Sequence, residues 1–546
     1  MDDIDTVVLT KCGRCLAHLR AEIEDRRFGL VFGAGVSKPL NFPSWSELVD
    51  RIARHSDVDG QHVVAGAGSN LPDTSKTQML FQHYKSKMLD ITSAPITAKF
   101  ERRVQGQWRR IIQDCLYDGV PETAEEMKDK HPYIRHLMQV IMKTEMTVNY
   151  NFDDTIQQLL LLEDPCGNPN SLRGFETVSN ASLSFRPDRT ILYHPNGFLP
   201  RNLLEHPSEN LVFSDHSFAD QLIESMAGYH SSLLHHFSKT TCLFIGLSLQ
   251  DATLRHLLRQ SAIINPGHYH YFVHWQQPGV THDTAAELAL RDANFEVYNL
   301  VTLFLGDDEI AAFGRLLAMS EPDLRREAEE MGVHLKHFYY LTGAIGAGKS
   351  TCLSYLGSFK TYEEWAEVRP ADLKKAWKAL SNDERTRLDQ WIIHQFDLKN
   401  HKLLDQRIGI HIVDRTPLDP LAFTETSDIK KKAGMIAQGL SPGKAARRPQ
   451  DGHIILLTGA PDDMEARAIG RHKQSRADVI GEMQQKLRQI FDGSSATIIE
   501  TLGLSIPQVV KRVAQTILLD TYSPVDLSEV LRRIECNGFA AAVRVS

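Results

Sequence analysis

Two segments of this chain place a glycine-rich turn between a run of apolar residues and a stretch that favours a helix. The first runs from apolar residues 28–32 into the turn G-A-G at 33–35. The second runs from residues 337–341 into G-A-I-G-A-G-K-S at 343–350. Such strand-turn-helix units are typical of parallel sheets whose faces are covered by helices. The chain is therefore predicted to have an α/β fold.

The length of the chain and its other apolar runs predict two domains. At 546 residues the chain exceeds what one hydrophobic core usually supports. A charged stretch after residue 319, S-E-P-D-L-R-R-E-A-E-E-M-G, predicts an exposed connecting helix. We therefore expect domains at 1–320 and 336–546, joined by a linker helix at 321–335. Further strands are predicted at 146–150, 190–193, 241–247, 269–275 and 295–299 in the first domain, and at 408–413 and 453–457 in the second.

The second glycine-rich segment has the spacing G-x-x-x-x-G-K-S. In this P-loop motif, backbone amides surround phosphate groups, the lysine contacts the outer phosphates and the serine coordinates Mg²⁺. The sequence therefore predicts a P-loop NTPase or kinase-like domain that binds ATP or another nucleotide. A structural glycine turn is the alternative. The predicted nucleotide-binding residues are Gly343, Gly346, Gly348, Lys349, Ser350 and Thr351, with Ser350 as the Mg²⁺ ligand.

Composition argues against several classes of function. The formal net charge of -8 disfavours general binding to nucleic acids, which usually requires a basic surface. The sequence has no run of roughly 18 apolar residues and does not start with a signal-peptide pattern. We therefore expect a cytoplasmic protein without membrane contact. Cys12 and Cys15 form a C-x-x-C pair without a second pair, so thiols on a helix face are favoured over a zinc site.

The first glycine-rich turn by itself fits either dinucleotide binding or a tight turn, with a helix predicted from Ser44. Three motifs follow it in order: N-Y-N-F-D-D at 149–154, Y-H-P-N-G-F-L-P at 193–200 and F-I-G-L-S-L-Q-D at 244–251. Together with G-A-G-V-S-K-P-L-N-F-P-S-W at 33–45, they resemble bacterial sirtuin-like proteins, in particular the antiviral branch that destroys NAD. The resemblance implies an N-terminal Rossmann-like sirtuin domain, NAD as substrate and a homo-oligomer.

The resemblance also assigns roles to individual residues. Asn151 and Asp153 would hold the nicotinamide ribose or its attacking water. A turn that caps a helix is the structural alternative for these two residues. The residues implied to contact the rest of the dinucleotide are Gly33, Ala34, Gly35 and Ser37 at the phosphates, Trp45 in the same segment, and Gly246 and Ser248 on the adenosine side.

One residue departs from the pattern of this family. Asn196 stands where the family has its catalytic histidine, and asparagine cannot act as a base near neutral pH. Three explanations stay open: His194 is the base, the site binds NAD without cleaving it, or a substitution has inactivated it. His194 has its own structural alternative, a strand histidine bonded to the backbone. The sequence also lacks the four-cysteine zinc module of sirtuin deacylases, which favours hydrolysis of free NAD.

In the second domain, Asp414 and Arg415 resemble the aspartate-arginine segment of nucleoside and nucleotide kinases. There, Asp414 would contact a sugar hydroxyl, Mg²⁺ or an attacking oxygen, and Arg415 would bind a substrate phosphate. A capping aspartate and a solvated arginine are the alternative. Residues 362–365 fit either substrate contacts or an amphipathic helix. Four basic residues fit either a kinase lid or a solvated helix face: Arg467, Arg471, Lys473 and Arg476.

Three functions are compatible with these motifs. The leading hypothesis is an effector of antiphage defence that hydrolyses NAD to nicotinamide and ADP-ribose under the control of a nucleotide bound to the kinase-like domain. The second is a bifunctional protein whose C-terminal domain phosphorylates a nucleoside or nucleotide. The third is a non-catalytic NAD-binding scaffold, which the residue at Asn196 favours.

Overall fold

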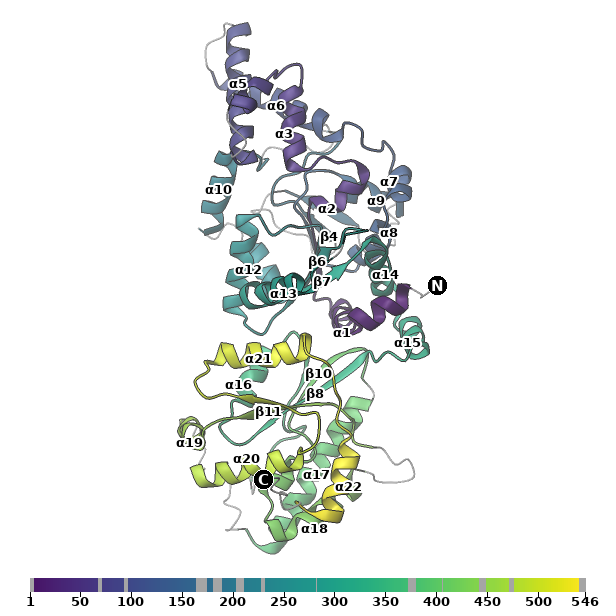
Figure 1. The fold of residues 1–546 in the computed structure, drawn as a ribbon, viewed down its shortest axis with the longest axis vertical. Coiled ribbons are helices and arrows are strands. Elements are labelled where there is room, and N and C mark those ends of the chain that lie inside the picture. The colour runs from purple at the N-terminus through teal and green to yellow at the C-terminus, as the bar shows by residue number, and fades with distance from the viewer. Residues whose placement is uncertain are drawn as a thin grey trace. The chain divides into compact units, whose positions relative to one another are not determined.

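The computed structural model describes residues 4–66, 71–92, 97–163, 174–179, 189–202, 211–226, 231–280, 282–371, 380–404, 406–440, 448–470 and 476–539. The chain divides into two compact units. Unit 1 comprises Met1–Lys11, Glu22–Ile264 and Tyr269–Ser320, and unit 2 comprises Cys12–Ala21, Asn265–His268 and Glu321–Ser546. Each unit contains one parallel sheet (Figure 1), so the predicted α/β class is confirmed.

The sheet of unit 1 has seven strands in the order β3-β4-β2-β1-β5-β6-β7. All neighbouring strands are parallel. The chain passes from β1 to β2 on one side and later returns to β5 on the other, so β1 and β5 flank a topological switch point. The strands are β1 (Phe28–Phe32), β2 (Met146–Asn149), β3 (Phe175–Val178), β4 (Thr190–Tyr193), β5 (Thr241–Ile245), β6 (His270–Trp275) and β7 (Leu300–Leu305).

The central strands follow directly from their apolar sequences. β1 and β5 read F-G-L-V-F and T-C-L-F-I, and every residue of both is buried. A strand that is covered on both faces needs such a continuous apolar run. Phe32 lies opposite Asn149 of β2 and Ile245 of β5, so the three strands end at the same level. The residues that follow these ends therefore gather at one edge of the sheet.

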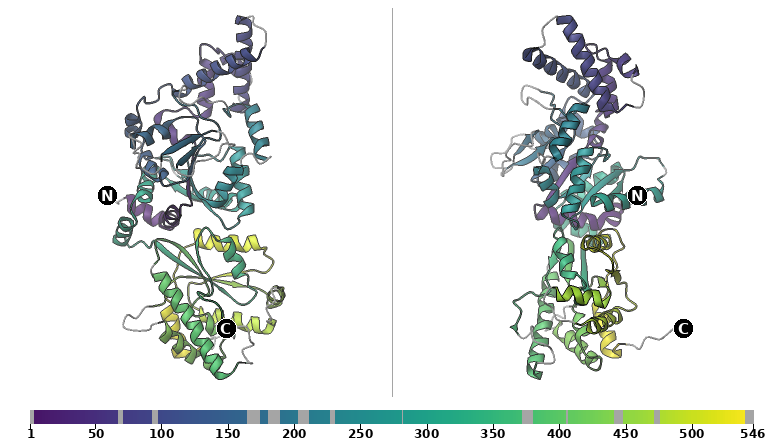
Figure 2. Two further views of the ribbon diagram at one scale, coloured as in Figure 1. Left: turned by 180° about the vertical axis from the view of Figure 1, so that it is seen from behind. Right: turned by 90° about the vertical axis from the view of Figure 1, so that its left-hand side faces the viewer.

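Helices cover both faces of this sheet (Figures 1 and 2). One group consists of α7, α8, α9 and α14, and the other of α10, α11, α12 and α13. α3, α4, α5 and α6 pack against one another as a third group. The helices with most of their residues in unit 1 are α1 (Ile4–Glu24), α2 (Ala34–Ser37), α3 (Trp45–Arg54), α4 (Gln61–Gly66), α5 (Asp73–Thr92), α6 (Ala98–Tyr117), α7 (Ala124–Lys130), α8 (Ile134–Ile141), α9 (Thr155–Glu163), α10 (Asp215–Met226), α11 (Ser231–Lys239), α12 (Ala252–Ile264), α13 (Thr284–Tyr298) and α14 (Asp307–Ala318).

Two local predictions for unit 1 have opposite outcomes. The helix predicted from Ser44 is confirmed, because Ser44 and Glu47 form a capping box at the start of α3. The strand predicted at 295–299 is wrong, because these residues end α13 and the last strand is β7. Asn299 has φ 53°, a left-handed conformation that ends helices, so the helix continues to Tyr298 despite its aromatic and β-branched residues.

The sheet of unit 2 has five parallel strands in the order β12-β11-β8-β10-β9. α16 and α21 lie on one face, and α17, α18, α20 and α22 lie on the other (Figure 1). The strands are β8 (Lys336–Gly343), β9 (Lys360–Tyr362), β10 (Gly409–Asp414), β11 (His453–Thr458) and β12 (Thr497–Glu500). The helices are α15 (Glu321–Glu330), α16 (Lys349–Tyr355), α17 (Asn382–Leu404), α18 (Ile429–Gly439), α19 (Pro461–Ile469), α20 (Ala477–Ile490), α21 (Ile506–Leu518) and α22 (Leu527–Asn537).

Two weaker predictions about helices need correction. The charged segment after residue 319 does form a helix, α15, but Leu324 and Ala328 are buried, so it is amphipathic and not wholly exposed. Residues 362–365 do not form an amphipathic helix, because β9 ends at Tyr362 and the following residues form a turn. Arg467 lies on α19 and Arg476 caps α20, whereas Arg471 and Lys473 lie outside the described residues.

The C-x-x-C pair lies on one helix. Cys12 and Cys15 are both buried on α1, and neither is part of a disulfide. Within the described ranges, His, Cys, Asp and Glu side chains do not form a group of three or more that could hold a metal ion. A search of the same ranges found no helix with the length and hydropathy needed to span a membrane.

A close approach of two backbone segments shapes the edge of the unit 1 sheet at the switch point. A Cβ atom on Gly33 would lie 2.6 Å from the Gly246 carbonyl oxygen, and one on Gly35 would lie 2.8 Å from the Gly246 Cα. Gly246 itself has φ 72°, and a Cβ there would lie 2.5 Å from the Val36 backbone nitrogen. Backbone atoms cannot yield at such distances, so only glycine fits at these positions.

We predict that Gly246→Ala destabilises unit 1 much more than Gly279→Ala does. Gly279 has φ 76°, but a Cβ there would meet open space, so alanine adds only backbone strain of about 1 kcal/mol. Gly246→Ala adds the clash with Val36 and is expected to lower the free energy of unfolding by about 3 kcal/mol or more. Calorimetric unfolding checks this, and equal effects of the two substitutions would contradict it.

Candidate functional site

The first candidate site lies where β1, β2 and β5 end. The Gly33 amide donates to the Ile245 carbonyl oxygen at 3.0 Å, and the Gly35 amide donates to the Gly246 carbonyl oxygen at 2.9 Å. Both predicted phosphate-binding glycines thus use their amides to attach the turn to the end of β5. Their glycine identity is explained by the close approach to Gly246, and α2 begins directly after Gly33. A crevice at this switch point is where open α/β sheets usually bind ligands.

Three of the predicted site residues form one hydrogen-bonded cluster. The Asn151 side-chain amide donates to the Gly33 carbonyl oxygen at 2.9 Å and to Ser37 Oγ at 3.1 Å. Ser37 Oγ in turn donates to Asp153 Oδ2 at 2.9 Å. The structure therefore brings Asn151, Asp153 and Ser37 together across the ends of β1 and β2. Asn151 uses its side-chain N–H groups to bind Gly33 and Ser37. Its side-chain oxygen, Oδ1, is the group suited to accept a hydrogen bond from a ligand hydroxyl.

Asp153 is a buried carboxylate within this cluster. Its other oxygen, Oδ1, accepts from the Thr155 backbone amide at 3.1 Å, at the start of α9. Burial raises the pKa of Asp153, while the hydrogen bonds from Thr155 and Ser37 oppose that shift. The helix-capping alternative for Asp153 is thus realised, and it coexists with a position beside the glycine turn. A carboxylate that accepts from the backbone amide at the start of a helix has a fixed orientation.

His194 is fully buried, and both of its ring nitrogens are engaged. Nδ1 lies 2.8 Å from the backbone carbonyl oxygen of Asn151, which can only accept, so Nδ1 is protonated and donates. Nε2 accepts from Gln157 Nε2 at 2.8 Å. Burial lowers the pKa of His194 to about 4. A base needs a free nitrogen within reach of its proton donor. This geometry favours the structural alternative, in which His194 positions the Asn151 backbone.

Asn196 is also buried and bonded through both ends of its amide. Its Nδ2 donates to the Tyr150 carbonyl oxygen at 3.4 Å, and its Oδ1 accepts from Gln221 Nε2 at 3.1 Å. Gln221 also donates to the Pro195 carbonyl oxygen and accepts from Thr253. The surroundings of position 196 therefore provide a hydrogen-bond partner for both the N–H group and the oxygen of a side-chain amide. Gln157 and Gln221 carry no motif, and only the fold brings them to this site.

Trp45 begins α3 and lies in an aromatic cluster beside the site. Its ring centroid is 4.8 Å from that of Phe213 and 6.0 Å from that of Phe152, the residue between Asn151 and Asp153. Its indole nitrogen is buried and, among the described residues, has no hydrogen-bond partner. Ala34 starts α2, and Ser248 is exposed in the loop after β5. The structure thus places all the predicted dinucleotide residues at one edge of the sheet.

The second candidate site lies at the end of β8 in unit 2. Gly343, Gly346 and Gly348 have φ values of 151°, 83° and 97°, which residues with a side chain rarely adopt. Lys349 folds over this turn and donates to the carbonyl oxygens of Gly343 and Ala344 at 2.7 and 3.1 Å. Burial and the nearby Arg415 together lower the pKa of Lys349 to about 7, although nearby carboxylates oppose this shift. Ser350 is exposed at the start of α16.

Asp414 and Arg415 lie directly beside this turn because β10 is the neighbour of β8. Arg415 is buried, so the alternative of a solvated arginine is wrong. It donates to Glu364 at 2.6 Å and to Asp419 at 3.1 Å. It also has φ 66°, a strained conformation for a residue other than glycine. Asp414 Oδ1 is buried and, within the described part of the chain, has no hydrogen-bond partner, so Asp414 is not a simple cap.

Sequence reasoning missed two groups around Asp414. Lys399 on α17 is buried and donates to the Asp414 carbonyl oxygen at 2.8 Å, and burial lowers its pKa to about 8. Asp419 accepts from Thr342, Thr416 and Arg415. Arg415 and Asp419 are four residues apart, but residues 415–418 form a turn and not a helix, so this spacing alone could not have indicated their pairing. Lys399 comes from a distant helix and carries no signal in the sequence either.

One comparison with known proteins bears on the first site. Residues 145–298 match the family model described as a SIR2-like domain. The matched segment includes Asn151, Asp153, His194 and Asn196, and it supports a sirtuin-like relationship and NAD-related chemistry for this part. It starts after the Gly33 turn, so the matched domain is not N-terminal as the sequence motifs implied, and it ends before the unit 2 sheet. A search among curated proteins gave no match.

We predict that His194→Gln weakens the loss of stability at acidic pH. The folded-state pKa of about 4 lies below the ordinary value of 6.5, so the unfolded chain binds the proton first. The contribution of neutral His194 to the free energy of unfolding is therefore fully present above pH 6.5 and is lost as the pH falls toward 4. Between these values, the free energy of unfolding of the variant should fall by about 1 kcal/mol less per pH unit. Urea unfolding from pH 7 to 4.5 tests this, and parallel pH profiles would contradict it.

Proposed function

We propose that unit 1 binds NAD and hydrolyses it to nicotinamide and ADP-ribose. The observation that carries the proposal is the cluster of Asn151, Ser37 and Asp153, which joins the glycine turn to a segment that matches a SIR2-like domain. Cleavage of the nicotinamide bond leaves a cationic sugar, so it requires hydroxyl acceptors and negative charge at the ribose. In this proposal, the side-chain oxygen of Asn151 accepts from a ribose hydroxyl, and the Asp153 carboxylate provides the negative charge.

The remaining residues of the site fit a dinucleotide. The turn at Gly33 lies at the switch point of the sheet, where open α/β sheets bind ligands. Trp45 and Phe152 provide an aromatic surface next to Asn151, against which a planar nicotinamide could pack. Hydrolysis of free NAD is favoured over removal of acyl groups because the sequence has no four-cysteine zinc module between its motifs.

We further propose that a nucleotide bound to unit 2 regulates this activity. The Lys349 turn and the positive charge of Arg415 fit a phosphate group. Ser350 and the unpaired Asp414 oxygen suit a Mg²⁺ ion that neutralises phosphate charge. Antiphage defence through NAD depletion by a homo-oligomer is the biological role implied by the resemblance of the motifs. This part of the proposal rests on analogy.

Phosphoryl transfer by unit 2 is a second candidate function. It is favoured by the unpaired Asp414 oxygen, which lies beside a glycine turn and the buried ion pairs of Arg415 with Glu364 and Asp419. Such an arrangement has an acceptor for a hydroxyl proton and a cation for a phosphate. A third candidate, a scaffold that binds NAD without cleaving it, is favoured by the amide bonding of Asn196.

We predict that Asn196→His raises nicotinamide release from NAD by about 100-fold, because histidine supplies a base that asparagine lacks. Adding Asn151→Ala or Asp153→Asn to this variant should remove the gain. The matched control is Asp292→Asn, which changes an exposed carboxylate of α13 and should leave the rate unaltered. Nicotinamide is measured by chromatography. Absence of release from every form, with NAD binding retained, would contradict hydrolysis and favour the scaffold.

We predict that Lys349→Ala abolishes ATP binding to unit 2 and reduces the effect of ATP on nicotinamide release. The control is Lys360→Ala, which removes an exposed lysine of β9 and should change neither property. Binding is measured by calorimetry at pH 8, above the pKa of about 7 of Lys349, where phosphate binding should take up protons. An effect of ATP that has the same size in Lys349→Ala as in the unaltered chain would contradict regulation by unit 2. Transfer of labelled phosphate from ATP to a panel of nucleosides would favour the kinase function.

A further inference from the structure

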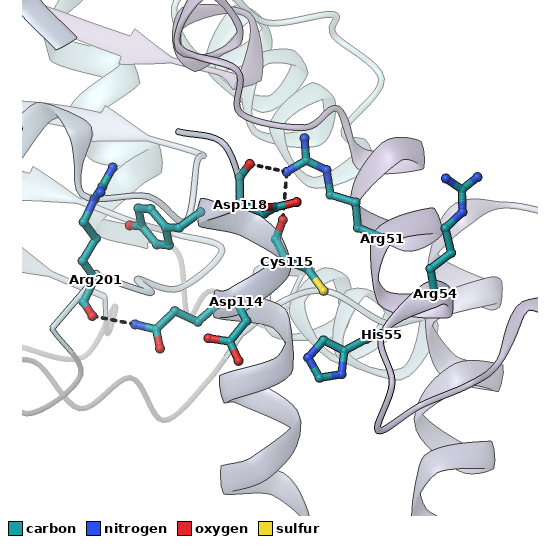
Figure 3. Close-up of a pocket in the computed structure, with 9 residues that line it drawn as sticks. Arg51, Arg54, His55, Asp114, Cys115, Asp118 and Arg201 are labelled. Atoms are coloured by element: carbon teal, nitrogen blue, oxygen red, sulfur yellow. Dashed lines mark hydrogen bonds between the residues drawn. The ribbon is translucent and has the colours of Figure 1, made fainter. Parts of the chain in front are cut away.

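A cavity in unit 1 has no role in the proposed reaction. It has a volume of about 760 Å³ and lies between the end of α3 and the second half of α6, with Arg201 on its other side (Figure 3). Sites for small organic ligands typically have volumes of about 300–1,000 Å³. None of the residues predicted from the NAD motifs lines it. The cavity is therefore large enough for a nucleotide and separate from the residues of the Asn151 cluster.

Cationic side chains dominate the wall of this cavity. Arg51, Arg54 and Arg201 line it together with His55, against the carboxylates of Asp114 and Asp118. With His55 neutral, the lining carries a formal charge of +1, in a protein whose net charge is -8. Guanidinium groups bind phosphate oxygens through paired hydrogen bonds. The positive charge of the lining thus favours an anionic ligand, although the protein as a whole is negatively charged.

The arginines are held in different ways. Arg51 donates through Nη1 to the Cys115 and Asp118 carbonyl oxygens at 3.1 and 2.8 Å, which caps the end of α6 and offsets its negative dipole. Arg54 is exposed and, among the described residues, forms no hydrogen bond or ion pair. Arg201 donates through Nη2 to the Pro121 carbonyl oxygen, and its Nε is buried. The guanidinium groups of Arg51 and Arg54 thus keep donors for a ligand, whereas that of Arg201 is engaged within the protein.

The cavity is connected to the Asn151 segment through Asp154. The Tyr117 hydroxyl, whose ring lines the cavity, donates to Asp154 Oδ1 at 3.0 Å. The Arg201 backbone amide donates to Asp154 Oδ2 at 3.0 Å, and its guanidinium lies 4.8 Å from the centre of the Tyr117 ring. Gln113 also holds the Pro200 and Arg201 carbonyl oxygens. A ligand that moves Arg201 would therefore act on the residue next to Asp153.

We propose that this cavity binds a nucleotide-sized organic phosphate, and that its binding regulates the site at Asn151 and Asp153. Arg51, Arg54 and His55 bind the phosphate groups, while Asp114 and Asp118 accept hydrogen bonds from sugar hydroxyls or amino groups. Cys115 is a packing residue, because burial raises its pKa to about 12 and keeps the thiol protonated. Only the regulatory part of this inference depends on the proposed hydrolysis of NAD.

ADP is the probe that tests the binding part. The experiment is calorimetric titration of the full chain carrying Lys349→Ala, which removes phosphate binding by unit 2, in saturating NAD, which occupies the site at Asn151. We expect ADP to bind and Arg54→Gln to weaken it at least tenfold. The matched control is Arg102→Gln, an exposed arginine of α6 outside the cavity, which should leave ADP binding unchanged. Because Arg54 is exposed and unpaired, its substitution should not affect folding.

Three results of this titration would overturn the inference. They are absence of ADP binding, binding that NAD displaces, and binding that Arg54→Gln leaves unaltered. Inorganic pyrophosphate should bind at least tenfold more weakly than ADP, and equal affinity would overturn the assignment to a nucleotide-sized ligand. For regulation, ADP should change nicotinamide release in Lys349→Ala but not after Arg54→Gln is added. If no form releases nicotinamide, the proposed hydrolysis fails while the calorimetric result still decides the cavity.

Discussion

The contact between the Gly33–Gly35 turn and Gly246 is the constraint on which unit 1 depends. Two loops that follow neighbouring strands approach each other so closely that a single Cβ atom would collide with backbone. Hydrogen bonds from the turn to the end of β5 fix this approach, and they use the amides of both glycines of the turn. Asn151 then attaches to the Gly33 carbonyl oxygen and Ser37, which brings Asp153 to the same edge. The candidate chemistry of unit 1 therefore follows from how tightly β1 and β5 are joined at their ends.

Unit 2 uses glycine for a different physical reason. In its turn, Gly343, Gly346 and Gly348 adopt positive φ angles, so conformation as well as space requires them there. The same turn is surrounded by buried charges of both signs. Arg415 has a strained backbone conformation and forms ion pairs with two carboxylates. Buried charges are tolerated only when they are paired or hydrogen-bonded, so the fold must place a partner next to each charge of this cluster. Two glycine turns of similar sequence thus create different environments.

Much of the fold could be predicted from the chain, and its exceptions have clear causes. Strands buried on both faces are continuous apolar runs, so β1 and β4 were predicted at their observed bounds. The error at 295–299 arose because β-branched and aromatic residues also occur in the last turn of a partly buried helix, and Asn299 determines where the helix ends. The short edge strands β3 and β9 are largely outside the core and carry weak apolar signals. Pattern recognition succeeds where burial is complete and fails where a single backbone conformation decides.

The sequence by itself determined the glycine turns, the order of the motifs and the residue types at each candidate site, because these depend on local spacing and side-chain chemistry. Only the tertiary structure decided the state of those residues. It engaged both nitrogens of His194 through Asn151 and Gln157, surrounded Asn196 with amide partners and buried Arg415 between carboxylates. The partners come from elements far apart in the chain, and whether a side chain is free or bonded depends on neighbours that only packing brings together.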